Sequence, residues 1–222
     1  MGRDTSEKGV LEIAEHEGFV LGPYLCSASV WTIWVGHTAS AGGPDPARMP
    51  RVDTRKWSDA QVKQEILKGL RQFDIDLTSY ETRVNDAIKR PLKAHQFDAL
   101  VSFDLNTGGI YKANLTKQIN AGDLSGKGFM GWLKPPEIFK RRKAEQNLFI
   151  TGNYDANGDM IPIYDALGDG RTRFRTSISG AELAKLMKQA GAQHKVHAKR
   201  PAGLLQLLET IFGFLFRKRK GN

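Results

Sequence analysis

The chain has 222 residues, which is enough for one domain with an appendage or for two small domains. Hydrophobic residues at 40% and charged residues at 26% exclude a largely disordered chain. Cys26 is the only cysteine, which excludes an intrachain disulfide and a multi-cysteine metal site. No apolar run reaches the ~20 residues that span a bilayer, and residues 1–20 lack a Sec-type signal pattern.

Most of the formal net charge of +9 lies at the end of the chain. Residues after Met187 carry eight basic side chains and one acidic one, whereas the rest of the chain is nearly neutral. A cationic tail of this kind is typical of proteins that bind nucleic acid, anionic lipid or another anionic polymer. The tail contains an apolar segment, residues 204–216, followed by Arg-Lys-Arg-Lys. It is either a terminal helix docked on the body or an interfacial membrane helix, and the basic cluster favours the membrane.

The first half of the chain predicts a helix, a small sheet and a second helix. Residues 6–16 have an apolar stripe with Ser6 as a cap, and Gly18 can end the helix in a left-handed turn. Residues 19–56 combine short β-prone pieces with turn residues, which predicts hairpins with long loops. A capping box at Ser58 opens a helix over residues 58–79.

The second half predicts mainly helices. Pro91 suits the first turn of a buried helix that ends at residues 106–109. Further helices are expected after Asn114, over 136–150 and over 179–190, and residues 153–178 are expected to form turns. The expected division is a first domain over residues 1–152, a turn-rich extension with a short helix and basic linker over 153–200, and an amphipathic apolar helix with a cationic tail over 201–222.

One spacing points to chemistry. Glu17 is followed after eight residues by Cys26, and after five more by Thr32. The surrounding segment also carries Gly18, Tyr24, Ile33, Gly36, His37 and Thr38. In this pattern the sequence resembles the phage-type lysozymes, the endolysins of glycoside hydrolase family 24. The resemblance continues through residues 96–108, 119–123 and 141–152, and so covers roughly residues 8–152.

The resemblance implies an α+β fold in which a small β-containing lobe and a larger helical lobe enclose a cleft, joined by a long helix. The implied activity is hydrolysis of the β-1,4 bond between N-acetylmuramic acid and N-acetylglucosamine in peptidoglycan. This chemistry requires no metal and no organic cofactor. The C-terminal extension with its amphipathic cationic helix lies outside the resemblance.

Cleavage of a glycosidic bond needs a proton donor and a partner for the oxocarbenium-like centre. Glu17 suits the donor, because the negative end of a helix dipole favours a neutral carboxyl group. The resemblance places Cys26 at the Asp/Cys position, where it either activates water, attacks the sugar or shapes the water site. Thr32 is expected to orient the attacking water through its hydroxyl.

The resemblance also implies supporting residues. His37 takes a structural position behind the sheet, and Tyr24 and Asn106 belong to the surroundings of the site. Arg141 is expected to pair with Glu17, with Arg142 as the alternative. The pattern departs from the family at Trp34, where glycine is usual and where a bulky ring fills part of the cleft or alters the turn, and at residues 134–140.

We therefore expect a monomeric endolysin that binds peptidoglycan and has no nucleic-acid partner. It would wait in the host bacterial cytoplasm without a signal peptide, be released by a holin and act on the periplasmic wall. Residues 201–222 would bind anionic membrane or lipopolysaccharide. Two alternatives remain open: a chromosomal muramidase that opens the wall for secretion, and a non-catalytic peptidoglycan-binding protein on the same scaffold.

Overall fold

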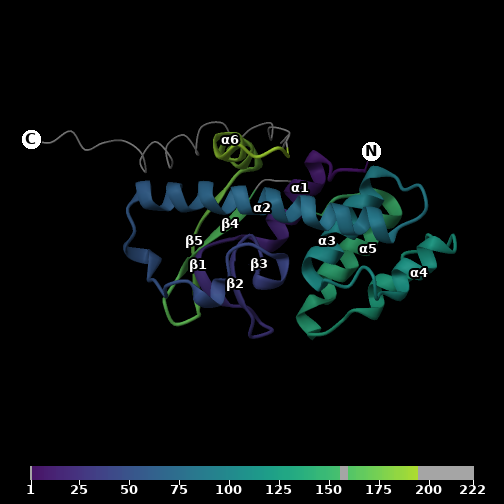
Figure 1. The fold of residues 1–222 in the computed structure, drawn as a ribbon, viewed down its shortest axis with the longest axis horizontal. Coiled ribbons are helices and arrows are strands. Elements are labelled where there is room, and N and C mark those ends of the chain that lie inside the picture. Colours follow the sequence, from purple (N-terminus) through teal and green to yellow (C-terminus); the bar gives the residue numbers. More distant parts are fainter. Residues whose placement is uncertain (1, 156–159, 195–222) are drawn as a thin grey trace, which may run out of the picture.

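The fold mixes helices with one sheet, as the sequence predicts (Figure 1). The computed structural model describes residues 2–155 and 160–194. In chain order the helices and strands are α1 (Glu7–Glu17), β1 (Phe19–Leu25), β2 (Trp31–Trp34), β3 (His37–Thr38), α2 (Asp59–Ala87), α3 (Ala94–Thr107), α4 (Asn114–Asn120), α5 (Phe139–Thr151), β4 (Ile161–Ala166), β5 (Thr172–Ile178) and α6 (Gly180–Ala190). The α+β class is thereby confirmed.

The sheet is larger than the sequence predicts. Its strand order is β3-β2-β1-β4-β5, and β1 and β4 pair in parallel while the other neighbours are antiparallel. The expectation of turns over residues 153–178 is therefore wrong for residues 161–166 and 172–178. The alternation of Ile161 and Ile163 with more exposed residues is a strand pattern. The sequence did not predict these strands, because Pro162 lies within β4 and the segment between β4 and β5 is rich in Asp and Gly, and these residues are typical of turns.

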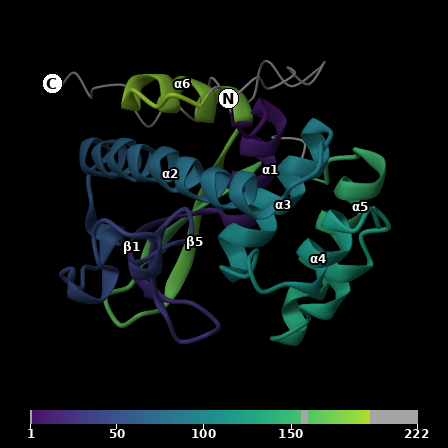
Figure 2. The ribbon, with the colours of Figure 1, turned by 45° about the vertical axis from the view of Figure 1, so that its right-hand side comes forward.

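The long helix α2 runs past both the sheet and the group of helices α3, α4 and α5 (Figure 2). The predicted capping box is present, since the backbone N–H of Gln61 donates to Ser58 and that of Ser58 donates to Gln61. The helix continues to Ala87 rather than ending near residue 79, because Val84 and Ala87 extend the buried stripe. Its buried face contributes Ile66, Leu70, Phe73 and Leu77 to the core.

The central helix α3 is buried, as predicted, but it starts later. Its first residue is Ala94, and the backbone N–H of Lys93 donates to the side chain of Gln96 at 2.9 Å. Pro91 therefore precedes the helix and is not in its first turn. Gly108, with a φ of 60°, ends the helix in the left-handed conformation. Phe97, Leu100 and Phe103 on this helix are all fully buried.

The cationic tail, residues 195–222, lies outside the described residues, and so do the predictions for the linker and the terminal helix. Among residues 2–155 and 160–194, none of the helices has the length and apolar character needed to cross a bilayer. The division into domains at residues 152 and 200 stays a prediction. The parallel pairing of β1 with β4 joins the strands after residue 160 to the same sheet as the N-terminal hairpin.

Candidate active site

Glu17 is the last residue of α1, and the chain turns sharply after it. Ser6 caps the start of α1 by accepting the backbone N–H of Gly9, as predicted. At the other end Gly18 has a φ of 67°, which a side chain would make unfavourable. A Cβ at position 18 would also lie 3.1 Å from both Pro162 and Tyr164 of β4. Glycine therefore lets the chain leave the helix directly into β1 and fixes the position of Glu17.

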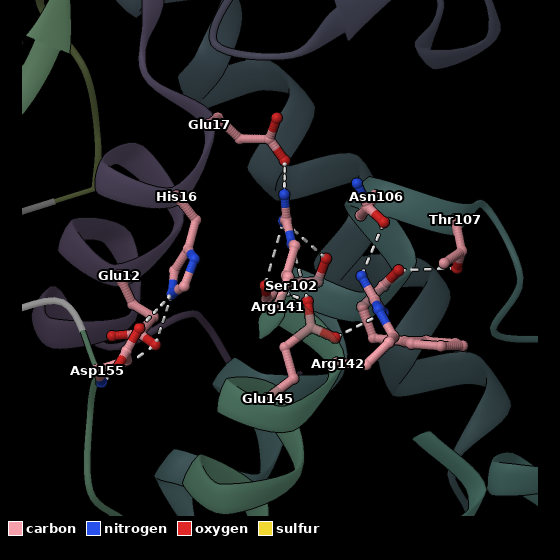
Figure 3. A network of polar contacts seen from close by, with 11 residues as sticks. Glu12, His16, Glu17, Ser102, Asn106, Thr107, Arg141, Arg142, Glu145 and Asp155 are labelled. Carbon is pink, nitrogen blue, oxygen red and sulfur yellow. Dashed lines mark hydrogen bonds and ion pairs between the residues drawn. The ribbon is translucent and has the colours of Figure 1, made fainter. Parts of the chain in front are cut away.

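The carboxylate of Glu17 lies between the sheet and the helices. Nη1 of Arg141, on α5, is 2.5 Å from Oε1 of Glu17 (Figure 3). On the other side is Gly36, in the turn between β2 and β3, where a Cβ would lie 2.8 Å from Oε2. The side chain of Glu17 is 14% exposed. The carboxylate is thus held from both sides and still reaches solvent.

Arg141 divides its hydrogen bonds between two carboxylates. Its Nε donates to Oε1 of Glu145 at 3.0 Å while its Nη1 donates to Glu17. Ser102 of α3 donates from its hydroxyl to the same Glu145 oxygen at 2.8 Å. Burial opposes the charge on Arg141, but the two carboxylates outweigh it and raise the pKa of the guanidinium. Arg141 therefore stays cationic, and Glu17 is only one of the two carboxylates that stabilise its charge.

Arg142 points away from Glu17 and towards α3. Its side chain is fully buried, forms an ion pair with Oε2 of Glu145 at 2.5 Å and donates to Oδ1 of Asn106 at 2.7 Å (Figure 3). Of the two arginines that the sequence left open, Arg141 is the one that contacts Glu17. Asn106 supports Arg142 and does not touch Glu17 directly.

Tyr24, Cys26 and Thr32 belong to the β1–β2 hairpin. Tyr24 pairs with Thr32 across the strands, and Cys26 lies half-buried in the turn. Burial is the main cause that raises the pKa of Tyr24, and the charges of Glu17 and Cys26 add to it. The hydroxyl of Thr32 donates to the backbone oxygen of Val30 at 3.0 Å, and its side chain is buried.

His37, on β3, is buried and faces α2. Its Nδ1 is 2.8 Å from Oδ2 of Asp76 on α2, and its Nε2 is 2.9 Å from the backbone oxygen of Pro44. Burial opposes the charged ring, but these two acceptors outweigh it and raise the pKa of His37. Both ring nitrogens are thus occupied by structural partners.

Trp34 has a backbone conformation that is typical of glycine, and its ring is buried in the core. Its φ is 52°, a value that glycine adopts easily and a tryptophan rarely. The ring packs against α2, where a Cβ at Gly69 would lie 2.5 Å from it, and its Nε1 donates to Glu65 at 2.7 Å. Of the two alternatives for this ring, the one in which it fills part of the cleft is therefore wrong, and the one in which it alters the turn stays a prediction.

Three residues near Glu17 were given no role from the sequence. Glu145 follows Arg141 by four positions and Arg142 by three, a spacing that places oppositely charged groups on one helix face. That signal was present in the sequence. The contacts of Ser102 and Gly36 depend on how α3 and the β2–β3 turn pack, which no local pattern shows.

The apolar cavity of about 350 Å³ between α2, α6 and strands β4 and β5 is not part of this arrangement, since none of the predicted site residues lines it. The site is instead the fixed carboxyl group of Glu17 beside a hairpin that carries a thiol and a hydroxyl. An acidic side chain at a partly exposed junction is what acid-catalysed cleavage of a glycosidic bond requires.

Comparison with known proteins points to the same chemistry, cleavage of a glycosidic bond. The family model described as phage lysozyme matches residues 14–145. An endolysin of Acyrthosiphon pisum secondary endosymbiont phage 1 is 32% identical over 157 residues, which are 65% of this chain and 96% of that protein. An endolysin of Salmonella phage P22 is 29% identical, over 66% of this chain and 97% of that protein. The structure of an endolysin from Escherichia coli O157:H7 phage FAHEc1 is 27% identical, with a TM-score of 0.49 over 68% of this chain and 96% of that one.

The chain belongs to the phage lysozyme family. It is accordingly a glycoside hydrolase of the muramidase type. The individual roles of Glu17, Cys26 and Thr32 stay predictions.

Proposed function

We propose that the protein hydrolyses the β-1,4 bond between N-acetylmuramic acid and N-acetylglucosamine, with Glu17 as the proton donor. The observation that carries this proposal is the position of the Glu17 carboxylate, held between Arg141 and Gly36 and still in reach of solvent. A donor must keep a fixed direction towards the leaving oxygen, and contacts on both sides supply that fixation.

Cys26 and Thr32 position the incoming water in this proposal. Both residues lie on the β1–β2 hairpin, which also carries Tyr24, and the charges of Glu17 and Cys26 add to the raised pKa of Tyr24. Cys26 acts either as a base in its thiolate form or as a nucleophile, and the two routes differ in whether a covalent sugar intermediate forms. The Thr32 hydroxyl donates its proton to the backbone oxygen of Val30, so it would orient the water by accepting a hydrogen bond from it.

The biological setting that fits is lysis of a bacterial cell by a phage. Two phage endolysins align with this chain over almost their whole length, 96% and 97%. We propose that the enzyme is made in the host cytoplasm, is released by a holin and meets peptidoglycan in the periplasm. The net charge of the tail supports binding of residues 201–222 to anionic membrane or lipopolysaccharide at the envelope.

The test is muropeptide mass spectrometry on purified sacculi. The wild type is expected to release fragments with reducing ends. Glu17→Gln is expected to lose about a thousandfold or more in rate, because the amide N–H is not acidic enough to protonate the leaving oxygen. Glu137→Gln, an exposed glutamate before α5, is the matched control and should keep the wild-type rate. Anhydro ends would mean transglycosylation, and binding without turnover by the wild type would mean a non-catalytic protein.

A further inference from the structure

The strands that complete the sheet lie beyond the segment matched by the family model, which ends at residue 145. Phe19 and Ile163 are neighbours across β1 and β4. Both face α2, since Phe19 reaches Gly69 and Ile163 lines the cavity beside Ile66. Side chains alternate along a strand. The next pair, Val20 and Tyr164, therefore points to the opposite face of the sheet.

On that face Tyr164 lies directly against the residue after Glu17. A Cβ added to Gly18 would lie 3.1 Å from the Tyr164 ring, so the ring packs on the turn that holds the candidate proton donor. Burial is the main cause of the raised pKa of Tyr24, and the charges of Glu17, Cys26 and Tyr164 add to it, in that order. Tyr164 thus borders the candidate site although it follows Glu17 by 147 positions in the chain.

Phe174 continues this surface on the edge strand β5. It pairs with Tyr164 across the antiparallel ladder, and the two rings meet edge to face with centroids 6.0 Å apart and an interplanar angle of 79°. Tyr164 is half-buried, whereas Phe174 is 56% exposed. One exposed apolar side chain needs no explanation, but a pair of rings that extends from the turn after Glu17 is suited to bind a ligand.

We propose that Tyr164 and Phe174 form an aromatic surface that binds a sugar residue of the glycan strand next to the bond that is cleaved. This inference rests on the proposed function. The two faces of an N-acetylated pyranose are lined with C–H groups, which pack on an aromatic ring and lose their contact with water. A polymeric substrate extends past Glu17 on both sides of the cleaved bond. The aromatic surface begins at Tyr164, whose ring packs against Gly18, the residue after Glu17.

The contact is with the substrate rather than with the reacting atoms, so it should alter binding more than turnover. We expect Phe174→Ala to raise the KM for soluble, peptide-free glycan strands roughly three- to tenfold while kcat stays within about twofold. Phe174→Tyr keeps the ring and should restore the wild-type KM. Ile75→Ala removes an exposed apolar side chain of α2 that is 60% exposed and should change neither value.

Binding is measured separately in the Glu17→Gln background, so that the result does not depend on turnover. The dissociation constant of the same glycan strands should rise by the same factor when Phe174→Ala is added. An unchanged dissociation constant, or an equal effect of Ile75→Ala, would overturn the proposal. If the wild type failed to cleave sacculi, the proposed function would fall, while the binding comparison would still decide whether the aromatic surface holds glycan.

Discussion

Arg141 joins Glu17 to the helical half of the molecule through an ion pair of 2.5 Å. The same guanidinium bonds Glu145 at 3.0 Å, so one side chain fixes the candidate acid and completes a buried charge network at the same time. Loss of this arginine would therefore damage both the site and the fold.

We expect Arg141→Ala to lower the free energy of unfolding by about 3 kcal/mol, because it leaves the buried Glu145 with only one cationic partner. Arg141→Lys should recover only part of the lost stability. Its ammonium group keeps the positive charge but cannot bond both carboxylates as the guanidinium does. Urea unfolding measures the stability, and sacculus hydrolysis should fall on the order of 10- to 100-fold in both variants. Lys140→Ala, an exposed neighbour, is the control.

The chemical role of Cys26 is tested by exchanging its side chain. Cys26→Ser should lose most of the activity, about a hundredfold, because a hydroxyl is neither ionised nor strongly nucleophilic at neutral pH. Cys26→Asp should keep a good part, since a carboxylate can activate water from the same position. The initial rates at which the wild type and the two variants hydrolyse sacculi measure these effects. A Cys26→Ser variant as fast as the wild type would show that the thiol takes no part in the reaction.

The strained backbone of Trp34 gives a comparison of three residues. Removal of its buried ring costs about 3–5 kcal/mol. Glycine returns about 1 kcal/mol by relieving the positive φ, whereas alanine does not. Trp34→Gly should therefore be less stable than the wild type by about 2–4 kcal/mol and yet more stable than Trp34→Ala. Thermal and urea unfolding measure this order, and an alanine variant at least as stable as the glycine variant would contradict it.

Stability should fall at alkaline pH through His194. Burial opposes its charge, but hydrogen bonds to Glu81 and Asp74 of α2 outweigh burial and raise the pKa of His194 to about 9. A histidine in the unfolded chain titrates near 6.5. The stabilisation is therefore complete below about pH 6.5 and is lost as the pH rises through about 9. The difference between the two pKa values corresponds to about 3 kcal/mol, which solvent screening at this partly exposed site reduces to roughly 2 kcal/mol.

Urea unfolding at pH 6 and at pH 10 measures that loss. His37 contributes with the same sign, since its pKa is also raised. The decisive quantity is therefore the difference between the wild type and His194→Gln, which should be large at pH 6 and small at pH 10. A difference that does not change with pH would mean that the ring acts only through packing.

The tail is tested by ending the chain at residue 200. Full-length and shortened proteins should cleave sacculi at the same rate, because that assay reports sugar cleavage alone. Only the full chain should bind vesicles, more strongly as their content of anionic lipid rises and more weakly as salt screens the charges. Binding that ignores salt, or that the shortened protein shares, would refute a role for the tail at the membrane.

Local signals in the sequence predicted the ends of the elements that carry the site. Ser6 and Gly18 bound α1 and so place Glu17, and the resemblance identified Arg141 as its partner. The position of Tyr164 was not predictable in this way. It depends on parallel pairing between β1 and β4, two strands far apart in the chain, and no periodicity within either strand shows which neighbour it will take.

The central position of β1 also has a consequence for how the protein is made. Its partner on one side, β2, follows within a few residues, but its partner on the other side is translated only from residue 161 onwards. Until then the nascent chain exposes an unpaired strand edge, a surface that readily recruits other chains. Ribosome stalling or proteolysis before that point would therefore release fragments prone to aggregate.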